Sequence, residues 1–351
     1  DKTSCWPGGA TCSGGACLWK ASGRTWGLVP SGMFQMGCNK ALDSACRANE
    51  SPQHPVTIST PFWLSRDVVT TSEYDACVKA KKCAPAGIAA SSFGDASCST
   101  GWGNWTATAP KVGRENHPAN CVTPAKAKTY CAWAGGTLPT EAQWELAARG
   151  RCEENGGKAS CATKMRVYPW GNTTPVCKKH AVFPFGAVAG CGSPGTWAVG
   201  VGSPEGDGPY GHRDLAGNVW EFTRDFGDEF TPYPSSGAVT DPIDTKAGGL
   251  RGRGGATNHV ASNLRSSYRG SLNVTMESTI FGFRCVHPVN CDDGDACTKD
   301  KLVQGSCTHT AAADAIPCED GDACTAKDQC LAGKCAAGKT LTCDDGDPCT
   351  T

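Results

Sequence analysis

Residues 130–145 read YCAWAGGTLPTEAQWE, and this stretch does most to decide the fold. Thr140 and Gln143 have the spacing of a capping box, in which each side chain accepts a free backbone amide at the start of a helix. Apolar residues recur at helical spacing behind this cap, around Trp144, and a glycine follows the last of them. The stretch therefore predicts a helix over 140–148 that buries a tryptophan.

Shorter elements are expected around this helix. Polar residues before 71–81 can cap a second helix, in which Tyr74 and Cys77 face inward. Apolar runs at 56–58 and 62–64 have the length and composition of short strands. Few helices, many short strands and 44 glycines predict an irregular α+β domain.

Cysteine is the most unusual feature of the composition, with 24 residues in a chain of 351. The chain contains no CxxC pair and no closely spaced histidine pair, so disulfides are favoured over zinc ligands. A net charge of −1 without charged runs argues against nucleic acid or an anionic membrane surface as partner. No apolar stretch approaches the ~20 residues that span a bilayer. We therefore expect a secreted protein, extracellular or at the cell surface, with no membrane span.

Composition divides the chain into three regions. Residues 1–26 form a Cys-rich N-terminal segment, interpreted as a disulfide-tied lead-in, and residues 27–288 form the main domain. Residues 289–351 contain no aromatic side chain and begin a Cys-rich repeat. The first two regions hold 15 cysteines and the third holds nine, so complete pairing requires a disulfide between tail and body. Cys285 and Cys291 are well placed in the sequence to form it.

The tail repeats one motif. CDDGDACT at 291–298 returns as CEDGDACT at 318–325 and as CDDGDPCT at 343–350, with starts 27 and then 25 residues apart. Such repeats have almost nothing apolar to bury, so disulfides must hold them. Their Asp-Gly-Asp triplets resemble calcium loops but lack the full 12-residue pattern, and turns held by the flanking cysteines are the alternative. The repeat resembles Cys-rich modules of bacterial surface proteins, and we expect it to continue beyond residue 351.

Further motifs follow one order through the main domain. They are VPSGMFQMG at 29–37, FWLSRDVVT at 62–70, YPWGN at 168–172, DLAGNVWE at 214–221, RGGA at 253–256 and GFRC at 282–285. With the helical stretch, this series resembles the formylglycine-generating enzyme (sulfatase-modifying factor) family over about three quarters of the chain. The resemblance implies an irregular α+β, C-type-lectin-like fold, followed here by a disulfide-stapled tail.

The resemblance also implies oxidase chemistry at Cu(I), held by two cysteine thiolates near the end of the domain. Soft thiolates are the ligands that Cu(I) prefers. The matching window, 255–265, reads GATNHVASNLR, and no cysteine occurs between Cys191 and Cys285. We therefore expect no copper. A related branch uses clustered histidines for iron, but the seven histidines here are scattered, and only His259 lies in the window. It is either functional or an ordinary loop histidine.

Calcium is the ion that the resemblance favours. The family's structural Ca²⁺ site would be carried over to the side chains of Asp214 and Glu221 and the carbonyls of Gly217 and Val219. Hard cations prefer such oxygen ligands from a tight loop. In the alternative, Asp214 only caps a turn and Glu221 pairs with a neighbouring arginine, Arg213 or Arg224.

Related non-enzymatic domains use the segment matching 254–284 as a variable ligand surface. The candidate ligand-binding residues here are Asn258, His259, Asn263, Arg265 and Arg269, whose side chains adapt their hydrogen bonds to a partner. We therefore predict a non-catalytic extracellular binding or structural protein, such as a cell-surface adhesin or a subunit of a surface filament. Its partners would be other proteins, surface glycans or further copies of itself. The alternative is a diverged oxidase of this family acting on a protein or peptide.

Two more features allow two interpretations. Trp102, Trp105 and Trp197 occur in loop-like sequence and are either interface anchors or buried side chains. Glu141 and Glu145 lie on one face of the predicted helix, as a carboxylate pair or as parts of the scaffold. A glutamate in the first turn suits the helix dipole, which favours the structural role.

Overall fold

The computed structural model describes residues 11–341 except 14, 15, 22, 88–97, 99–102, 107, 108, 194, 229, 234–236, 247, 292–294, 304, 305 and 323. The chain divides into two compact units, with the boundary after Pro288. Among the described residues, no helix is both long and apolar enough to cross a membrane.

The two predicted helices are confirmed. Helix α4 (Glu141–Arg149) begins at the Thr140–Gln143 capping box and ends at Gly150, whose φ of 82° suits a residue without a Cβ. Helix α1 (Thr71–Lys79) begins at a second capping box. These caps satisfy amide groups that would otherwise lack partners, which is why helices of nine residues are well defined.

Helix α3 (Pro124–Trp133) was not predicted. Thr123 caps it and Pro124 occupies its first position, where the missing N–H costs nothing. Its apolar and polar residues are poorly segregated, so the periodicity that reveals amphipathic helices is missing. The Thr-Pro pair was the available signal. Shorter helical turns complete the set: η1 (Ala48–Glu50), α5 (Cys161–Lys164), α6 (Ala189–Gly192) and η2 (Ala261–Leu264).

Three sheets make up the larger unit. An antiparallel sheet has the order β1 (Thr11–Ser13), β2 (Ala16–Ala21), β3 (Arg24–Val29), β6 (Phe62–Ser65) and β12 (Val286–Pro288). A second has the order β10 (Gly270–Leu272), β9 (Gly249–Arg253), β7 (Trp220–Gly227) and β11 (Phe281–Gly282), and its last pair is parallel. A third has the order β4 (Gly32–Met36), β5 (His54–Ile58) and β8 (Val239–Thr240). Strands β5 and β6 confirm the two predicted apolar runs.

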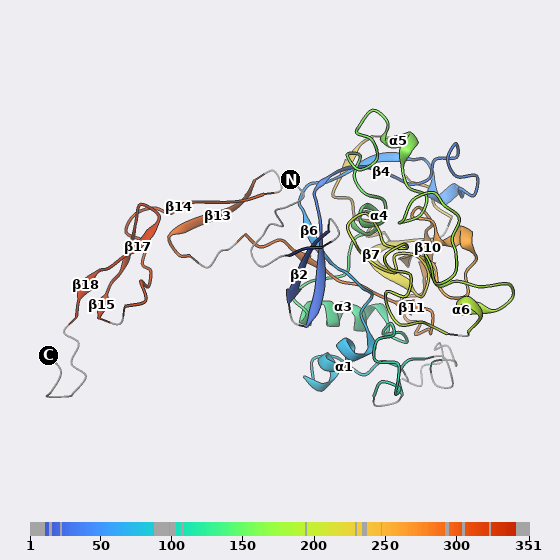
Figure 1. The fold of residues 1–351 in the computed structure, drawn as a ribbon, viewed down its shortest axis with the longest axis horizontal. Helices are drawn as coiled ribbons and strands as arrows, with labels where there is room; N and C mark the ends of the chain where they lie inside the picture. Colours follow the sequence, from blue (N-terminus) through green and yellow to red (C-terminus); the bar gives the residue numbers. More distant parts are fainter. Residues whose placement is uncertain are drawn as a thin grey trace. The chain divides into compact units, whose positions relative to one another are not determined.

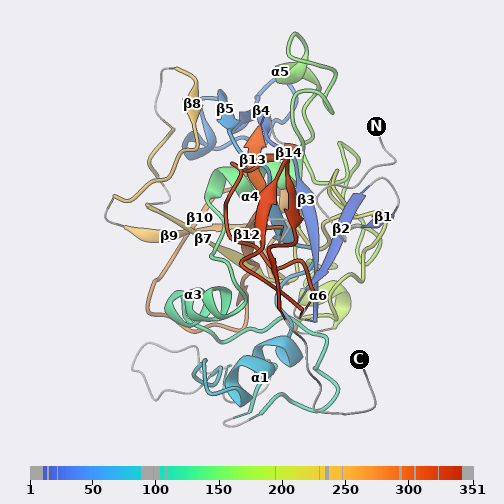
Figure 2. The same ribbon diagram turned by 90° about the vertical axis from the view of Figure 1, so that its left-hand side faces the viewer.

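Helix α4 occupies the centre of this unit in both views (Figures 1 and 2). It contacts β4, β5, β7 and β9. Leu146 belongs to the main apolar cluster with Phe34 and Val56, while Trp144 packs with Leu215. All five side chains are fully buried. The stretch quoted first therefore supplies the element on which two of the sheets pack.

The described part of the N-terminal segment, from residue 11 on, belongs to this unit. Strand β2 pairs with β3, and β3 pairs with β6, so the predicted boundary after residue 26 falls inside a strand. Trp26 is buried at that point. The expected disulfide tie is not made by Cys17, which is a free thiol. Backbone pairing attaches the described part of the segment.

Disulfides are as abundant as the cysteine count predicts. Cys131 of α3 is bonded to Cys285, across 154 residues of sequence, which overturns the expected pairing of Cys285 with Cys291. Cys291 is itself in a disulfide. The other pairs described in this unit are local: Cys38–Cys46, Cys77–Cys83, Cys98–Cys121, Cys152–Cys161 and Cys177–Cys191.

The smaller unit consists of hairpins. Strands β13 (Thr298–Val303) and β14 (Ser306–Ala311) form one, and β16 (Gln329–Leu331) and β17 (Lys334–Ala336) form another. The strands β15 (Thr325–Ala326) and β18 (Lys339–Thr340) form a third pair. The Cys297–Cys330 disulfide is buried and joins the first repeat to the second. A disulfide thus occupies the place of an apolar core, as expected for repeats without aromatic residues.

The Asp-Gly-Asp loop of the second repeat is an internally bonded turn. Asp320 accepts the amide of Asp322 at 2.8 Å, and Asp322 accepts the amide of Cys324 at 2.9 Å. Such bonds are typical of Asx turns. They agree with the turn interpretation, and calcium binding by these loops stays an open prediction. The third repeat and residues 292–294 lie outside the described residues.

We predict that the Cys131–Cys285 disulfide contributes more to the unfolding free energy than a disulfide between residues close in the sequence. The double variant Cys131→Ser/Cys285→Ser should lose about 2–5 kcal/mol of unfolding free energy, because the bridge closes a long loop in the unfolded chain. The control Cys77→Ser/Cys83→Ser opens a bridge spanning only 6 residues and should lose less. Denaturant unfolding compares the two, and equal losses would contradict the prediction.

Candidate functional site

The window that replaces the copper loop lies between β9 and β10. Gly254 and Gly255 turn the chain with φ of 91° and 73°, a region that favours glycine. His259 then packs edge-on against Trp220, with ring centroids 5.1 Å apart. The Trp220 indole N–H donates to His259 Nε2 at 3.4 Å, so this nitrogen is an acceptor. Burial lowers the pKa of His259, and nearby Arg47 lowers it further.

No thiolate pair is available among the described residues. Their cysteines are in disulfides except Cys17, which lies on β2 in a different sheet from the window. The described clusters with metal-like spacing, Cys297–Cys318–Cys335 and Cys38–Asp43–Cys46, consist mainly of cysteines already bonded as disulfides. Oxidised sulfur cannot act as the thiolate that a soft metal requires. The residues therefore do not fit the family's copper centre.

Asn218 ties the window to a neighbouring loop. Its backbone N–H donates to Val182 at 2.9 Å, and its carbonyl accepts from Thr257 at 3.2 Å. Its side chain exchanges two hydrogen bonds of 3.0 Å with the backbone of Trp197. Asn218 is fully buried. A direct bond of 2.8 Å from Gly190 to Thr257 also joins the loop to the window.

Apolar side chains project from both of these segments. Phe185 is 71% exposed and Val188 is 45% exposed on the loop, and Val260 is 61% exposed in the window. Asn258 is exposed beside Val260. We call these four residues the exposed face. The Cys177–Cys191 disulfide closes the loop that carries its first two members.

The predicted ligand residues are not all on this face. The structure leaves Asn258 exposed and His259 half-buried, but it buries Asn263, Arg265 and Arg269. Arg265 makes a bidentate ion pair with Glu50, with both N–O distances 2.6 Å. Arg269 makes another with Glu141, with both distances 2.7 Å. These two arginines therefore stabilise the interior of the domain and are not available on its surface to bind a ligand.

Sequence reasoning missed the buried network to which they belong. Arg253 bridges Glu141 and Glu145, and Glu145 also accepts from Arg149 at 2.8 Å. Arg269 keeps the pKa of Glu141 low, at about 2, against the cost of burial. The carboxylate pair on α4 is therefore structural. The available signal was the recurrence of Arg toward the end of the domain, in RGGA at 253–256, RSSYR at 265–269 and GFRC at 282–285.

Glu221, a predicted calcium ligand, pairs with Arg284 rather than with Arg213 or Arg224. The Arg284 guanidinium donates to both Glu221 oxygens, at 2.5 and 2.7 Å, and the Trp144 indole donates at 2.7 Å. Arg213 pairs instead with Asp67. Glu221 thus keeps limited capacity for a further ligand, since a carboxylate offers about four lone-pair positions.

Asp214, the other acidic calcium candidate, is less well satisfied. It is buried, and its carboxylate accepts the Gly200 amide at 2.5 Å. Burial raises its pKa to about 7. A cation beside such a carboxylate would offset the cost of burying the charge. The donor set is therefore compatible with Ca²⁺ at Asp214, whereas Glu221 can contribute only while remaining bound to Arg284.

The three tryptophans differ in environment. Trp105 is buried and meets Tyr74 edge-on at 5.7 Å. Trp197 is half-buried, with the Lys178 ammonium 3.8 Å from its ring centroid. Trp102 lies outside the described residues. Of the two that are described, only Trp197 has a partly accessible ring.

We predict that Arg265 acts through the fold. Arg265→Met should cost about 3–5 kcal/mol of unfolding free energy, because Glu50 would stay buried without its counter-charge. The double variant Arg265→Met/Glu50→Leu should recover much of that loss. Arg224→Met, at an exposed position, should change stability by less than about 0.5 kcal/mol. Urea unfolding measures the stability of all three variants. An Arg265→Met variant as stable as the wild type would refute the structural role of Arg265.

Calcium binding at Asp214 stays a prediction, and it has a direct test. Addition of Ca²⁺ to EGTA-treated protein should raise the midpoint of thermal unfolding, because a ligand of the native state stabilises it. Asp214→Ala should lose this calcium-dependent shift. Asp207→Ala removes another carboxylate whose pKa burial raises, and it should keep the shift. No shift in the wild type would exclude the site.

Comparison with known proteins places this arrangement in a family. The sulfatase-modifying factor enzyme 1-like domain matches residues 20–289. Formylglycine-generating enzyme of Streptomyces coelicolor is 31% identical over 304 residues, covering 76% of this chain and 90% of that protein. The Mus musculus enzyme is 30% identical over 182 residues, 49% of this chain, and the match spans only 44% of that protein.

Inactive relatives and solved structures are also similar. Inactive C-alpha-formylglycine-generating enzyme 2 of Bos taurus is 42% identical over 100 residues, 28% of this chain and 29% of that protein. PvdO from Pseudomonas aeruginosa has a TM-score of 0.55 at 22% identity, covering 76% of this chain and 95% of PvdO. Treponema denticola variable protein 1 has a TM-score of 0.54 at 17% identity, with coverage of 78% and 98%. These structures share the fold, and the chain belongs to the sulfatase-modifying factor enzyme 1-like family.

Proposed function

We propose that this protein is a non-catalytic extracellular binding or structural protein, acting as a cell-surface adhesin or as a subunit of a surface assembly. Its partner would be another protein, a surface glycan or a further copy of itself. The proposal rests on one observation. Where the resemblance implies two copper-binding cysteines, the window 255–265 contains none, and the only free cysteine among the described residues lies on another sheet.

The exposed face supports a binding role. Four side chains stand on two segments that Asn218 and the Gly190–Thr257 bond hold together. Rigid support lowers the entropy that association costs, because the contact residues are already ordered. Exposed apolar side chains that gather on one surface are typical of interaction sites, whereas isolated ones are ordinary. The hydrogen bonds between the two segments are what bring Phe185, Val188 and Val260 into the same part of the unit.

The environment of His259 argues against replacement iron chemistry. Its Nε2 accepts from Trp220, and its Nδ1 is buried without a hydrogen-bond partner among the described residues. Neither nitrogen is exposed beside a second histidine, and metal sites of this kind need several convergent ligands. The structure offers no specific observation in favour of the diverged-oxidase alternative.

The smaller unit supports a surface location. Its hairpins are held by Cys297–Cys330 and Cys318–Cys335, and such disulfides persist only in oxidising compartments. The larger unit adds six more described pairs. A disulfide-held repeat suits a spacer or a contact between subunits, since it keeps its shape without a large core.

The proposal predicts a binding defect when a charge enters the exposed face. Val260→Asp should weaken self-association in sedimentation and electron microscopy, or adhesion of coated beads to cells, by tenfold or more, because the contact would have to bury an unpaired carboxylate. Val112→Asp is the matched control, since Val112 is 98% exposed on another loop. Equal effects of both variants, or none, would contradict the role of this face.

Metal analysis tests the non-catalytic part separately. Purified protein should contain no stoichiometric copper or iron and should not consume oxygen with a cysteine-containing peptide. Reconstitution with Cu(I) should leave this result unchanged, because no pair of free thiols exists among the described cysteines to hold the ion. Stoichiometric redox metal together with oxygen uptake that His259→Ala abolishes would overturn the proposal.

A further inference from the structure

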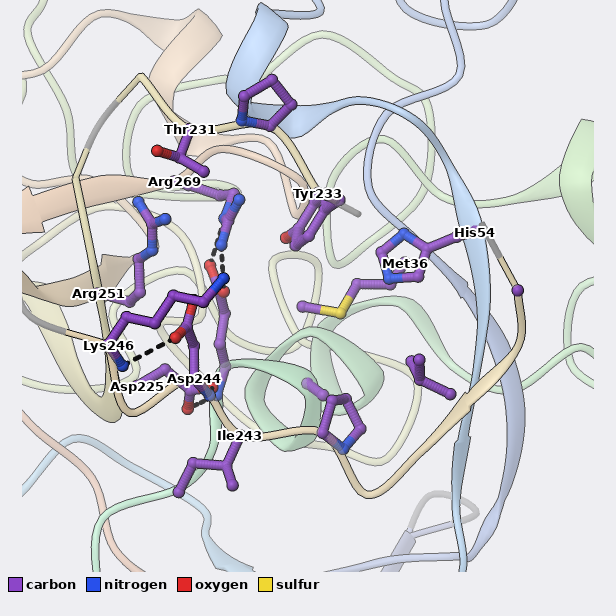
Figure 3. A pocket seen from close by; sticks show the side chains of 16 residues that line it. Met36, His54, Asp225, Thr231, Tyr233, Ile243, Asp244, Lys246, Arg251 and Arg269 are labelled. Carbon is purple, nitrogen blue, oxygen red and sulfur yellow. Dashed lines mark hydrogen bonds and ion pairs between the residues drawn. The ribbon is translucent and has the colours of Figure 1, made fainter. Parts of the chain in front are cut away.

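A cavity of about 470 Å³ lies beside the N-terminus of α4, away from the exposed face. Strands β4, β5, β7, β8 and β9 contribute to its walls, together with the segment 231–233 (Figure 3). Its volume falls within the range of small-molecule pockets, which is about 300–1,000 Å³. None of the residues of the exposed face lines it.

Two of the acidic groups of this cavity, Asp225 and Glu141, are engaged by donors, and a third, Asp244, accepts the Lys246 amide at 3.0 Å through one oxygen. Each oxygen of Asp225 accepts a backbone amide, that of Glu141 at 2.7 Å and that of Asp244 at 2.9 Å. Glu141 itself is neutralised by Arg269. Burial, together with the charge of Glu141, raises the pKa of Asp225 to about 7. The cavity therefore has little acidic capacity left for a guest.

Two donors in the same walls lack partners. Arg251 is 1% exposed, its Nε has no hydrogen-bond partner among the described residues, and it forms no ion pair with a described carboxylate. Its Nη1 donates to the carbonyl of Asp228. Tyr233 is 8% exposed, and its hydroxyl also has no described partner. In Figure 3 this hydroxyl lies on the side of the ring that faces Arg269 and Arg251.

Unpaired buried donors are costly, and native proteins seldom keep them without a reason. Tyr233 is held in place, since its amide donates to Ser51 at 2.9 Å and the Arg269 guanidinium lies 3.8 Å from its ring centroid. Rotation of the ring toward another partner would break its contact with Arg269. Lys246 adds an exposed cation to the lining. The polar wall is therefore rich in donors and positive charge, and its buried carboxylates, Asp225 and Glu141, already accept hydrogen bonds.

Much of the remaining lining is apolar, although His54, Thr231 and Asp244 also belong to it. Met36 is buried, Val239 is partly buried and packs against the main core, and Ile243 is 45% exposed. Two prolines, Pro232 and Pro242, complete this wall. A guest that suits both walls needs an acceptor group at one end and a hydrocarbon body at the other.

We propose that this cavity binds a small carboxylate on an apolar body, with the carboxylate accepting from Arg251 and Tyr233 and the body packed on Met36 and Val239. A free aromatic or branched-chain acid and the C-terminal residue of a polypeptide share this chemistry. A charged acceptor strengthens each bond, and the guanidinium supplies the opposite charge. The site is independent of the exposed face, so either can fail without the other.

Tyr233→Phe provides the sharpest test. Loss of an unpaired buried hydroxyl should leave the stability of the free protein unchanged or slightly raised, because no hydrogen bond is broken. The same change should weaken binding of 3-phenylpropionate about tenfold or more, as loss of a bond to a charged group does. Tyr210→Phe is the control, since the Tyr210 hydroxyl donates to Glu154 outside the cavity. Calorimetry and saturation-transfer NMR measure both variants on the full chain.

The probes distinguish the two sources. 3-Phenylpropionate and a pentapeptide ending in free phenylalanine are each compared with the corresponding amide. Tighter binding of the free acid supports a small-molecule guest, and tighter binding of the peptide supports a polypeptide C-terminus. In either case Tyr233→Phe and Arg251→Met must weaken binding of the preferred probe. The proposal is overturned if neither carboxylate binds at millimolar concentration, if the amides bind equally well, or if both variants bind like the wild type.

Discussion

The fold depends on buried ion pairs between arginines and glutamates. One arginine, Arg149, lies on α4, and the others, Arg253, Arg269 and Arg284, come after β7 in the sequence. Glu141, Glu145 and Glu221 are almost fully buried, and each accepts from at least one guanidinium. Removing one partner of such a pair costs far more than the pair adds in net stability, because an isolated charge would remain in a medium of low polarity. Each buried charge in the network therefore needs a partner from another part of the unit. Helix α4, the sheet that contains β7 and the end of the domain can be stable only when all three are folded together.

This constraint explains how so irregular a domain stays ordered. Loops rather than helices and strands make up much of the larger unit, and loops cannot pair their own backbone groups completely. Arginine compensates for this. Arg284 donates to Glu221 and also to the carbonyls of Ser65, Arg66 and Arg213, so one side chain fixes the end of β6 and two loop positions. The Cys131–Cys285 bridge adds a covalent bond next to the same residue.

Features that depend on residues close together in the sequence could be predicted, and features that depend on distant residues could not. The caps of α1 and α4 are local, so four residues suffice to recognise them. Helix α3 has a cap but little periodicity, and it was missed. The predicted ligand residues failed for a different reason. Arg265 and Arg269 are polar and lie in the segment that was predicted to bind ligands, yet their partners Glu50 and Glu141 are 215 and 128 residues away. Burial of an arginine is decided by such a distant carboxylate, and no local pattern reveals it.

The same network separates the two candidate binding regions. Arg253 and Arg269 both contact Glu141, the first from β9 and the second from the start of β10. The window that carries Asn258 and Val260 follows the end of β9, whereas Arg251 lies within β9 and lines the cavity. Because the shared carboxylate holds both strands, changes in the exposed residues of the window need not disturb the cavity. Asn258 and Val260 are exposed and take no part in the ion pairs of Arg253 and Arg269, so substitutions at these two positions leave the buried network intact.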